Sequence, residues 1–124
     1  MVVSRGRVQL GISEEVTCMF KKLSDATQFS TEKMKKNGIF ETERFFCDLY
    51  CFEPGQVQAP HAHRGSDKVY YVVSGKGFFQ VGDEERELGE GEIVMATSGQ
   101  SHGVVNRSEQ RLAVLVYMAP KPTH

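Results

Sequence analysis

Three histidines are spaced so that they can share one metal ion. His61 and His63 follow Pro60 and are separated by one residue, and His102 follows a later glycine-containing segment. Successive side chains of a strand point to opposite faces, so residues two apart share a face and both imidazoles can aim at one point. An imidazole from a neighbouring strand would complete the group. The spacing predicts a metal site built from two separate segments.

Short β-strands are predicted to position these histidines. From Phe45 onward, apolar runs of four to eight residues alternate with turn-forming pairs such as Pro54-Gly55 and Gly82-Asp83. The predicted strands are 45–52, 69–73, 78–81, 92–96, 103–106 and 111–118. Many short strands without a helical pattern between them favour an all-β antiparallel sandwich or barrel of the jelly-roll kind.

The chain is predicted to divide into three parts. Residues 1–40 form an N-terminal arm, a strand plus a short helical turn, that packs on the barrel; residues 41–120 form the barrel, and 121–124 a tail. In the arm, Ser30 or Thr31 can cap a helical turn that runs to Lys36 and ends at Asn37-Gly38.

Composition argues against several classes of function. The 124 residues suffice for one domain, and 15 lysines and arginines are balanced by 16 acidic residues. Without a basic run we expect no nucleic-acid partner, and without about 20 consecutive apolar residues or an apolar N-terminal core we expect no membrane span or signal peptide. A cytoplasmic protein is predicted.

The three cysteines are predicted to be free thiols. Along one strand Cys47 and Cys51 would be about 13 Å apart, whereas the α-carbons of a disulfide lie within about 7 Å. An odd cysteine count without a secretory signal also fits a reducing compartment.

Two glycine-framed motifs carry a family resemblance. Their fixed positions are Gly55, His61, His63, position 68 and Gly75 in the first, and Gly91, position 97, Gly99, His102 and Asn106 in the second. This spacing resembles the two motifs of the cupin superfamily and covers the chain from about residue 45 to 118. The resemblance implies a small monocupin, a double-stranded β-helix or jelly-roll barrel with a metal held inside by His61, His63 and His102.

Two positions depart from the family pattern. Thr97 replaces a proline that only stiffens a turn. Lys68 stands where the family places a ligating glutamate, and a protonated lysine cannot bind a metal. Asp67 is the alternative fourth ligand, although neighbouring strand residues face opposite ways. A three-histidine site completed by water is favoured.

The metal class leaves several activities open. Three imidazoles suit a divalent transition ion, whether iron, manganese, zinc, nickel or copper. The ligand count resembles that of the thiol dioxygenases and β-diketone dioxygenases, so a small-molecule dioxygenase or isomerase is expected. Tyr70 is the tyrosine of the Tyr70-Tyr71 pair that faces inward if it shares the parity of Lys68, and these two residues are the candidates for substrate contact or proton transfer.

Alternatives to an enzyme stay open. A non-catalytic module that binds or senses a small molecule has the same ligands, and a metal-free structural cupin is a third possibility. Unpaired strand edges favour a homodimer.

Overall fold

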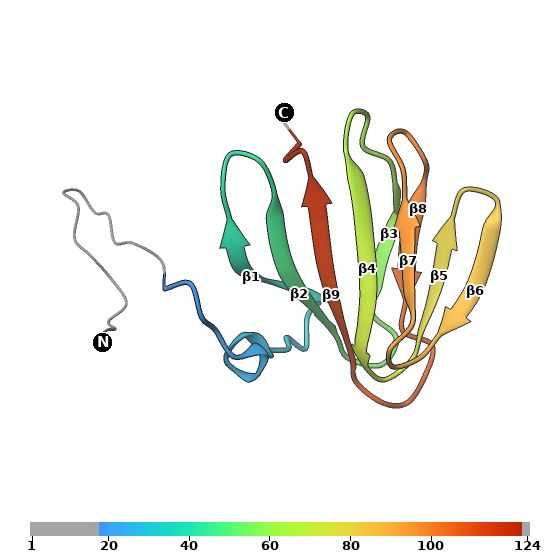
Figure 1. Cartoon of the computed structure of the whole chain (residues 1–124). Coiled ribbons are helices and arrows are strands. Elements are labelled where there is room, and N and C mark those ends of the chain that lie inside the picture. The colour runs from blue at the N-terminus through green and yellow to red at the C-terminus, as the bar shows by residue number, and fades with distance from the viewer. Residues whose placement is uncertain (1–17, 123–124) are drawn as a thin grey trace.

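The computed structural model describes residues 18–122, which form two facing antiparallel sheets (Figure 1). The elements are η1 (Leu23–Ala26, a 3-10 turn), β1 (Lys35–Glu41), β2 (Phe46–Phe52), β3 (Val57–His61), β4 (Asp67–Ser74), β5 (Gly77–Val81), β6 (Glu84–Leu88), β7 (Ile93–Ala96), β8 (His102–Val105) and β9 (Leu112–Ala119). The predicted all-β class is confirmed. No helix within residues 18–122 is long and apolar enough to cross a membrane.

The strand order identifies the jelly roll. One sheet has the order β1-β2-β9-β4-β7 and the other β3-β8-β5-β6, so most neighbours are distant in sequence. In Figure 1 the last strand, β9, lies between β2 and β4. This interleaving places the two histidine-bearing segments on adjacent strands, β3 and β8.

The main core lies between the sheets, and strand parity decides what enters it. In β4, Lys68, Tyr70 and Val72 are buried, whereas Tyr71 is 38% exposed. The prediction that Tyr70 is the inward tyrosine is therefore confirmed, and Lys68 shares its face. The other buried members of this core are Met34, Tyr50, Phe52, Phe79, Leu88, Val104, Leu112, Val114 and Val116.

All six predicted strands are present, and two strands of the barrel, β3 and β6, were missed. The charged run of β6, from Glu84 to Glu87, gives no apolar signal because β6 is an edge strand whose first four residues are exposed. Strand β3 was missed as an element because Pro60 interrupts it. A proline is tolerated there since β3 is also an edge.

The helical turn predicted from residue 30 or 31 to Lys36 is wrong. Residues 35–41 form β1, which pairs with β2, and the helical turn lies earlier, at η1. The predicted stop at Asn37 lies inside the strand, where its side-chain amide donates to the Gln28 carbonyl at 3.0 Å. Burial alternates here, with Asn37 and Ile39 buried and Lys36 and Gly38 exposed, so the period is that of a strand.

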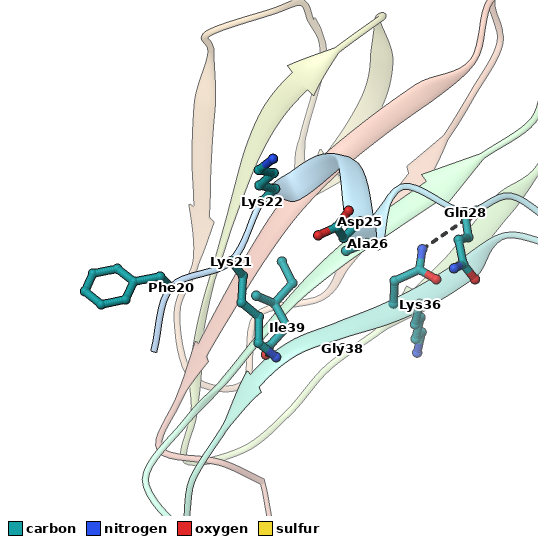
Figure 2. A pocket seen from close by; sticks show the side chains of 10 residues that line it. Phe20, Lys21, Lys22, Asp25, Ala26, Gln28, Lys36, Gly38 and Ile39 are labelled. Carbon is teal, nitrogen blue, oxygen red and sulfur yellow. Dashed lines mark hydrogen bonds between the residues drawn. The ribbon is translucent and has the colours of Figure 1, made fainter. Parts of the chain in front are cut away.

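Residues 26–29 cover part of the outer face of the larger sheet. Ala26 and Phe29 pack against a second apolar cluster formed by Ile39, Leu49, Cys51 and Ala113. Beside it, η1 and β1 enclose a cavity of about 550 Å³ (Figure 2). Lys21 lines this cavity and donates to the Ile39 carbonyl at 2.8 Å. Among residues 18–122 no histidine lines this cavity.

Substituting Gly75 is expected to destabilise the barrel. Gly75 lies between β4 and β5 with φ +86°, and an added Cβ would lie 2.3 Å from the Arg111 carbonyl oxygen. Because the obstacle is backbone, it cannot rotate away. We expect Gly75→Ala to lower the free energy of unfolding in urea by about 2–3 kcal/mol. Gly89→Ala, where nothing lies closer than 4.0 Å, is the control. Equal losses in the two variants would contradict this account.

Candidate metal centre

The barrel brings the three predicted histidines together. His61 is the last residue of β3, His102 is the first residue of β8, and the two are paired across the strands. His63 lies beyond β3, in the following loop, where its carbonyl accepts a hydrogen bond of 2.8 Å from the Gly99 amide. The expectation that His61 and His63 share one strand face is thus wrong for His63, whose loop is held against the loop before His102.

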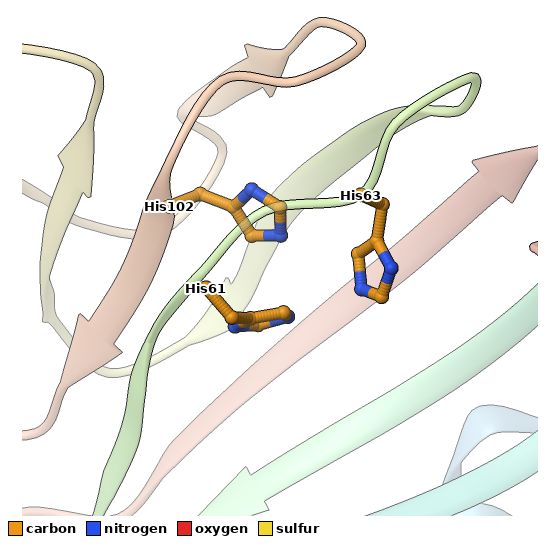
Figure 3. A group of neighbouring side chains, drawn as sticks. All are labelled: His61, His63 and His102. Carbon is orange, nitrogen blue, oxygen red and sulfur yellow. The ribbon is translucent and has the colours of Figure 1, made fainter.

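The three rings converge on a common space (Figure 3). One ligand nitrogen from each ring lies within 4.8 Å of the others. The ring centres are 4.4 Å apart for His61 and His102, and 4.9 Å apart for His61 and His63. Two nitrogens bound to one zinc at about 2.1 Å lie no more than about 4.2 Å apart, so small ring rotations suffice to close the group on an ion.

Backbone carbonyls fix the protonation of two rings. The Nδ1 atom of His61 lies 2.9 Å from the Ala59 oxygen, and that of His102 lies 2.9 Å from the Gln100 oxygen. A carbonyl only accepts, so each Nδ1 carries the proton and each Nε2 keeps its lone pair. The Nε2 of His102 is buried without a hydrogen-bond partner among residues 18–122. A buried acceptor with no donor fits a site that takes a cation.

A bulge and a glycine set the positions of His61 and His102. The register of β3 against β8 shifts between Gln58 and His61. Because of this bulge, the side chains of Gln58 and His61 lie on the same face of the sheet. Gly103 lies opposite the bulge, and an added Cβ would come within 3.0 Å of the Gln58 oxygen and the Pro60 nitrogen. The absence of a side chain at Gly103 therefore allows β3 to lie close to β8.

Burial keeps two of the imidazoles neutral. It lowers the pKa of His102 to about 4, and the positive charge of Lys68 acts in the same direction. It also lowers the pKa of His61. Neutral imidazole is the form that binds metals, so these two residues are ready for a metal in weakly acid solution.

A nuclear magnetic resonance titration of the metal-free protein tests this neutrality. We expect the ring nitrogens of His102 to titrate with a midpoint of about 4, whereas an ordinary histidine has a pKa of about 6.5. The unfolded chain takes up this proton at higher pH than the folded chain, so His102 contributes a loss of stability as the pH falls from about 6.5 to 4. A midpoint above about 6 would contradict the assignment.

Lys68 occupies an unusual place for a lysine. Its side chain is buried, with 2% of the residue exposed, and the ammonium lies 5.2 Å from the ring centres of both Tyr50 and Tyr70. Among residues 18–122 the ammonium has no hydrogen-bond or ion-pair partner. Burial lowers the pKa of Lys68 to about 8, and Asp48 partly opposes this shift.

Asp67 lies outside the histidine group. Within the described residues the potential metal ligands that converge are the three histidines alone. Asp67 is exposed, and its carboxylate accepts a hydrogen bond of 3.0 Å from the Ser98 amide. The side chain thus points toward the 97–100 loop, because its strand neighbour Lys68 takes the inward position. The assignment of Asp67 as an alternative fourth ligand is corrected: it anchors the loop that precedes His102.

Tyr70 connects the lysine to the histidines. Its ring centre is 6.0 Å from that of His102, and its hydroxyl donates to the Gln58 side-chain oxygen at 2.8 Å. The Nε2 of Gln58 is buried, and the Gln58 side chain also bonds the Tyr50 hydroxyl. Gln58 was missed as a site residue. Regular alternation of strand side chains, counted back from His61, predicts that Ala59 points inward and Gln58 outward, and the bulge reverses this for Gln58. Pro60 was the available signal for the bulge.

The fold and site define a cupin. Residues 48–118 match the cupin domain family, which is more than half of the chain. The protein therefore belongs to the cupin family.

Individual relatives match different fractions of the chain. A crystal structure of a protein from Thermus thermophilus is 43% identical, covers 83% of this chain and 98% of its own, and superposes with a TM-score of 0.81. The oxalate-binding protein of Thermotoga maritima is 26% identical over 82 residues, 66% of this chain and 67% of its own. The pectin degradation protein KdgF of Dickeya dadantii is 34% identical over 58 residues, 47% of this chain and 53% of its own.

Proposed function

We propose that His61, His63 and His102 hold a divalent transition-metal ion that binds a small oxygen-donor molecule inside the barrel. The observation that carries the proposal is the convergence of three ligand nitrogens within 4.8 Å, with the Nε2 of buried His102 unpartnered among residues 18–122. Three protein ligands leave coordination positions open to a small molecule, as in catalytic metal sites. The residues around these positions are Tyr70, Lys68 and Gln58.

A dioxygenase or isomerase is the enzymatic form of this proposal. A bound metal of this class supplies Lewis acidity toward an oxygen donor. The chain itself contributes orientation and proton transfer: His61 and His102 are fixed by their carbonyl partners, and Lys68 can exchange a proton near neutral pH because its pKa is about 8. Tyr70 is restrained by Gln58, and burial raises its pKa, so its role is that of a neutral hydrogen-bonding group.

A binding module without turnover is the second candidate. It is supported by the similarity to a relative named as an oxalate-binding protein. Both candidates require the same metal centre, and they differ in whether a bound molecule is converted.

Metal-reconstituted protein separates the two candidates. The protein is loaded in turn with iron, manganese, zinc, nickel and copper, then supplied with thiols, diketones, phenols and small carboxylates. Oxygen uptake is recorded, products are identified by mass spectrometry, and binding is measured by calorimetry. Turnover that disappears in His102→Ala supports the enzyme, and binding without conversion supports the module. Neither binding nor turnover with any metal would contradict the proposed function.

A further inference from the structure

The interior next to the histidines holds a positive charge that the fold does not neutralise. Lys68 is 2% exposed, and within residues 18–122 its ammonium contacts two aromatic ring faces and no acceptor. Interactions with ring faces stabilise a cation, but by less than an ion pair in a dry site does. Buried charges in proteins are normally paired, so this ammonium is available to an anion that comes from outside.

Lys68 and His102 both lie next to the ring of Tyr70. The Tyr70 ring lies 5.2 Å from the Lys68 ammonium on one side, and its centre lies 6.0 Å from that of the His102 ring. The alternation of side chains along β4 is consistent with this arrangement, because Lys68 and Tyr70 both point inward.

A buried amide holds the tyrosines on both sides of the lysine. The Gln58 side-chain oxygen accepts from the Tyr70 hydroxyl, and the Gln58 side chain also bonds the Tyr50 hydroxyl. The two rings that face the Lys68 ammonium are therefore linked through Gln58. Lys68 is the donor that an oxyanion would satisfy.

Charge balance specifies the kind of anion. A divalent ion on three neutral imidazoles together with one ammonium amounts to three positive charges in a partly buried site. The carboxylate that acts on Lys68 is the half-buried Asp48, which forms no ion pair with it. A glutamate ligand at position 68, as in the cupin pattern, would leave a single positive charge. Lysine in place of glutamate therefore makes the site more positive by two charges, which favours a ligand that carries more negative charge.

From these observations, and resting on the proposed metal centre, we infer that the ligand is a small dianion, one anionic group of which binds the metal while the other is received by Lys68. A short dicarboxylate is the simplest member of this class. Lys68 acts as a specificity-determining residue that selects ligands by charge.

Calorimetry with matched ligands tests this inference. The zinc-loaded protein is titrated with oxalate, malonate and succinate and with the monoamide of each, which has nearly the same shape and one charge less. Zinc retention is checked by elemental analysis, because dicarboxylates chelate metals. We expect at least one dianion to bind about 10-fold or more tightly than its monoamide. In Lys68→Met this preference should disappear while zinc affinity is kept or increased.

A second lysine provides the control. Lys36 also lies over the Tyr50 ring, at 5.4 Å, but is exposed, so Lys36→Met should change the preference by less than about 3-fold. As a second measurement, the Cε resonance of Lys68 should shift when the dianion is added and stay in place with the monoamide. Failure of wild-type protein to bind zinc would overturn the proposed function. Zinc binding with the same dianion preference in Lys68→Met as in wild type would overturn only this inference.

Discussion

Replacing His102 by alanine is expected to abolish stoichiometric zinc binding at neutral pH. The substitution removes one of three convergent nitrogens, and the ring it removes is the one whose buried Nε2 has no other partner among residues 18–122. Loss of a residue that merely orients a metal ligand costs about 10- to 100-fold in affinity, so loss of a ligand should cost at least about 100-fold. Competition with a chromogenic chelator measures the change.

The fourth histidine of the sequence gives the matched control for this experiment. His124 lies outside the described residues, and His124→Ala should bind zinc as the wild type does. Far-ultraviolet circular dichroism of both variants separates loss of the ligand from loss of the fold. A folded His102→Ala protein with wild-type zinc affinity would remove His102 from the metal centre.

Replacing Lys68 by methionine is expected to stabilise the metal-free protein by about 3 kcal/mol at pH 7. Methionine keeps an unbranched apolar side chain and removes a charge that is buried without an anionic partner in residues 18–122. The pKa of Lys68 is lowered from 10.5 to about 8, chiefly by burial, and each unit of displacement corresponds to about 1.4 kcal/mol. Urea unfolding of the two proteins gives the difference directly.

The pH dependence of this difference has a definite sign. Below pH 8 both folded and unfolded chains hold the proton, so the folded state carries the full penalty. Between pH 8 and 10.5 the folded chain has lost the proton and the unfolded chain has not, so the stability of the wild type rises with pH. The advantage of Lys68→Met should therefore vanish above about pH 10.5. Lys76→Met, a variant at an exposed lysine, should show no such change.

A result of the opposite sign would also be informative. If Lys68→Met were destabilised at pH 7, the two tyrosine rings would be stabilising the ammonium by more than burial costs. The account of Lys68 as an uncompensated charge would then be wrong.

The β-barrel and the histidine triad were predictable because they depend on local patterns. Apolar runs separated by turn residues located six strands, and the fixed spacing around His61, His63 and His102 selected the residues that the fold brings together. These patterns involve residues close together in the sequence, so contacts between distant strands do not change what they predict.

The parts that were missed depend on pairing between distant strands. Strand β6 is charged because it is an edge, and the inward turn of Gln58 comes from a bulge opposite Gly103. The predicted helical turn before Asn37 failed because pairing of β1 with β2 outweighs the local capping pattern. Strand parity gives Lys68 and Tyr70 the same face, but the burial of the Lys68 ammonium depends on its packing against Tyr50 and Tyr70.

Anomalous X-ray diffraction from crystals of untagged protein, recorded above and below the absorption edge of the metal found by elemental analysis, tests the central claim most directly. We predict a single strong anomalous peak per chain, within bonding distance of nitrogens from His61, His63 and His102. A metal-supplemented crystal with no peak among these rings, or with its peak elsewhere on the chain, would contradict the account.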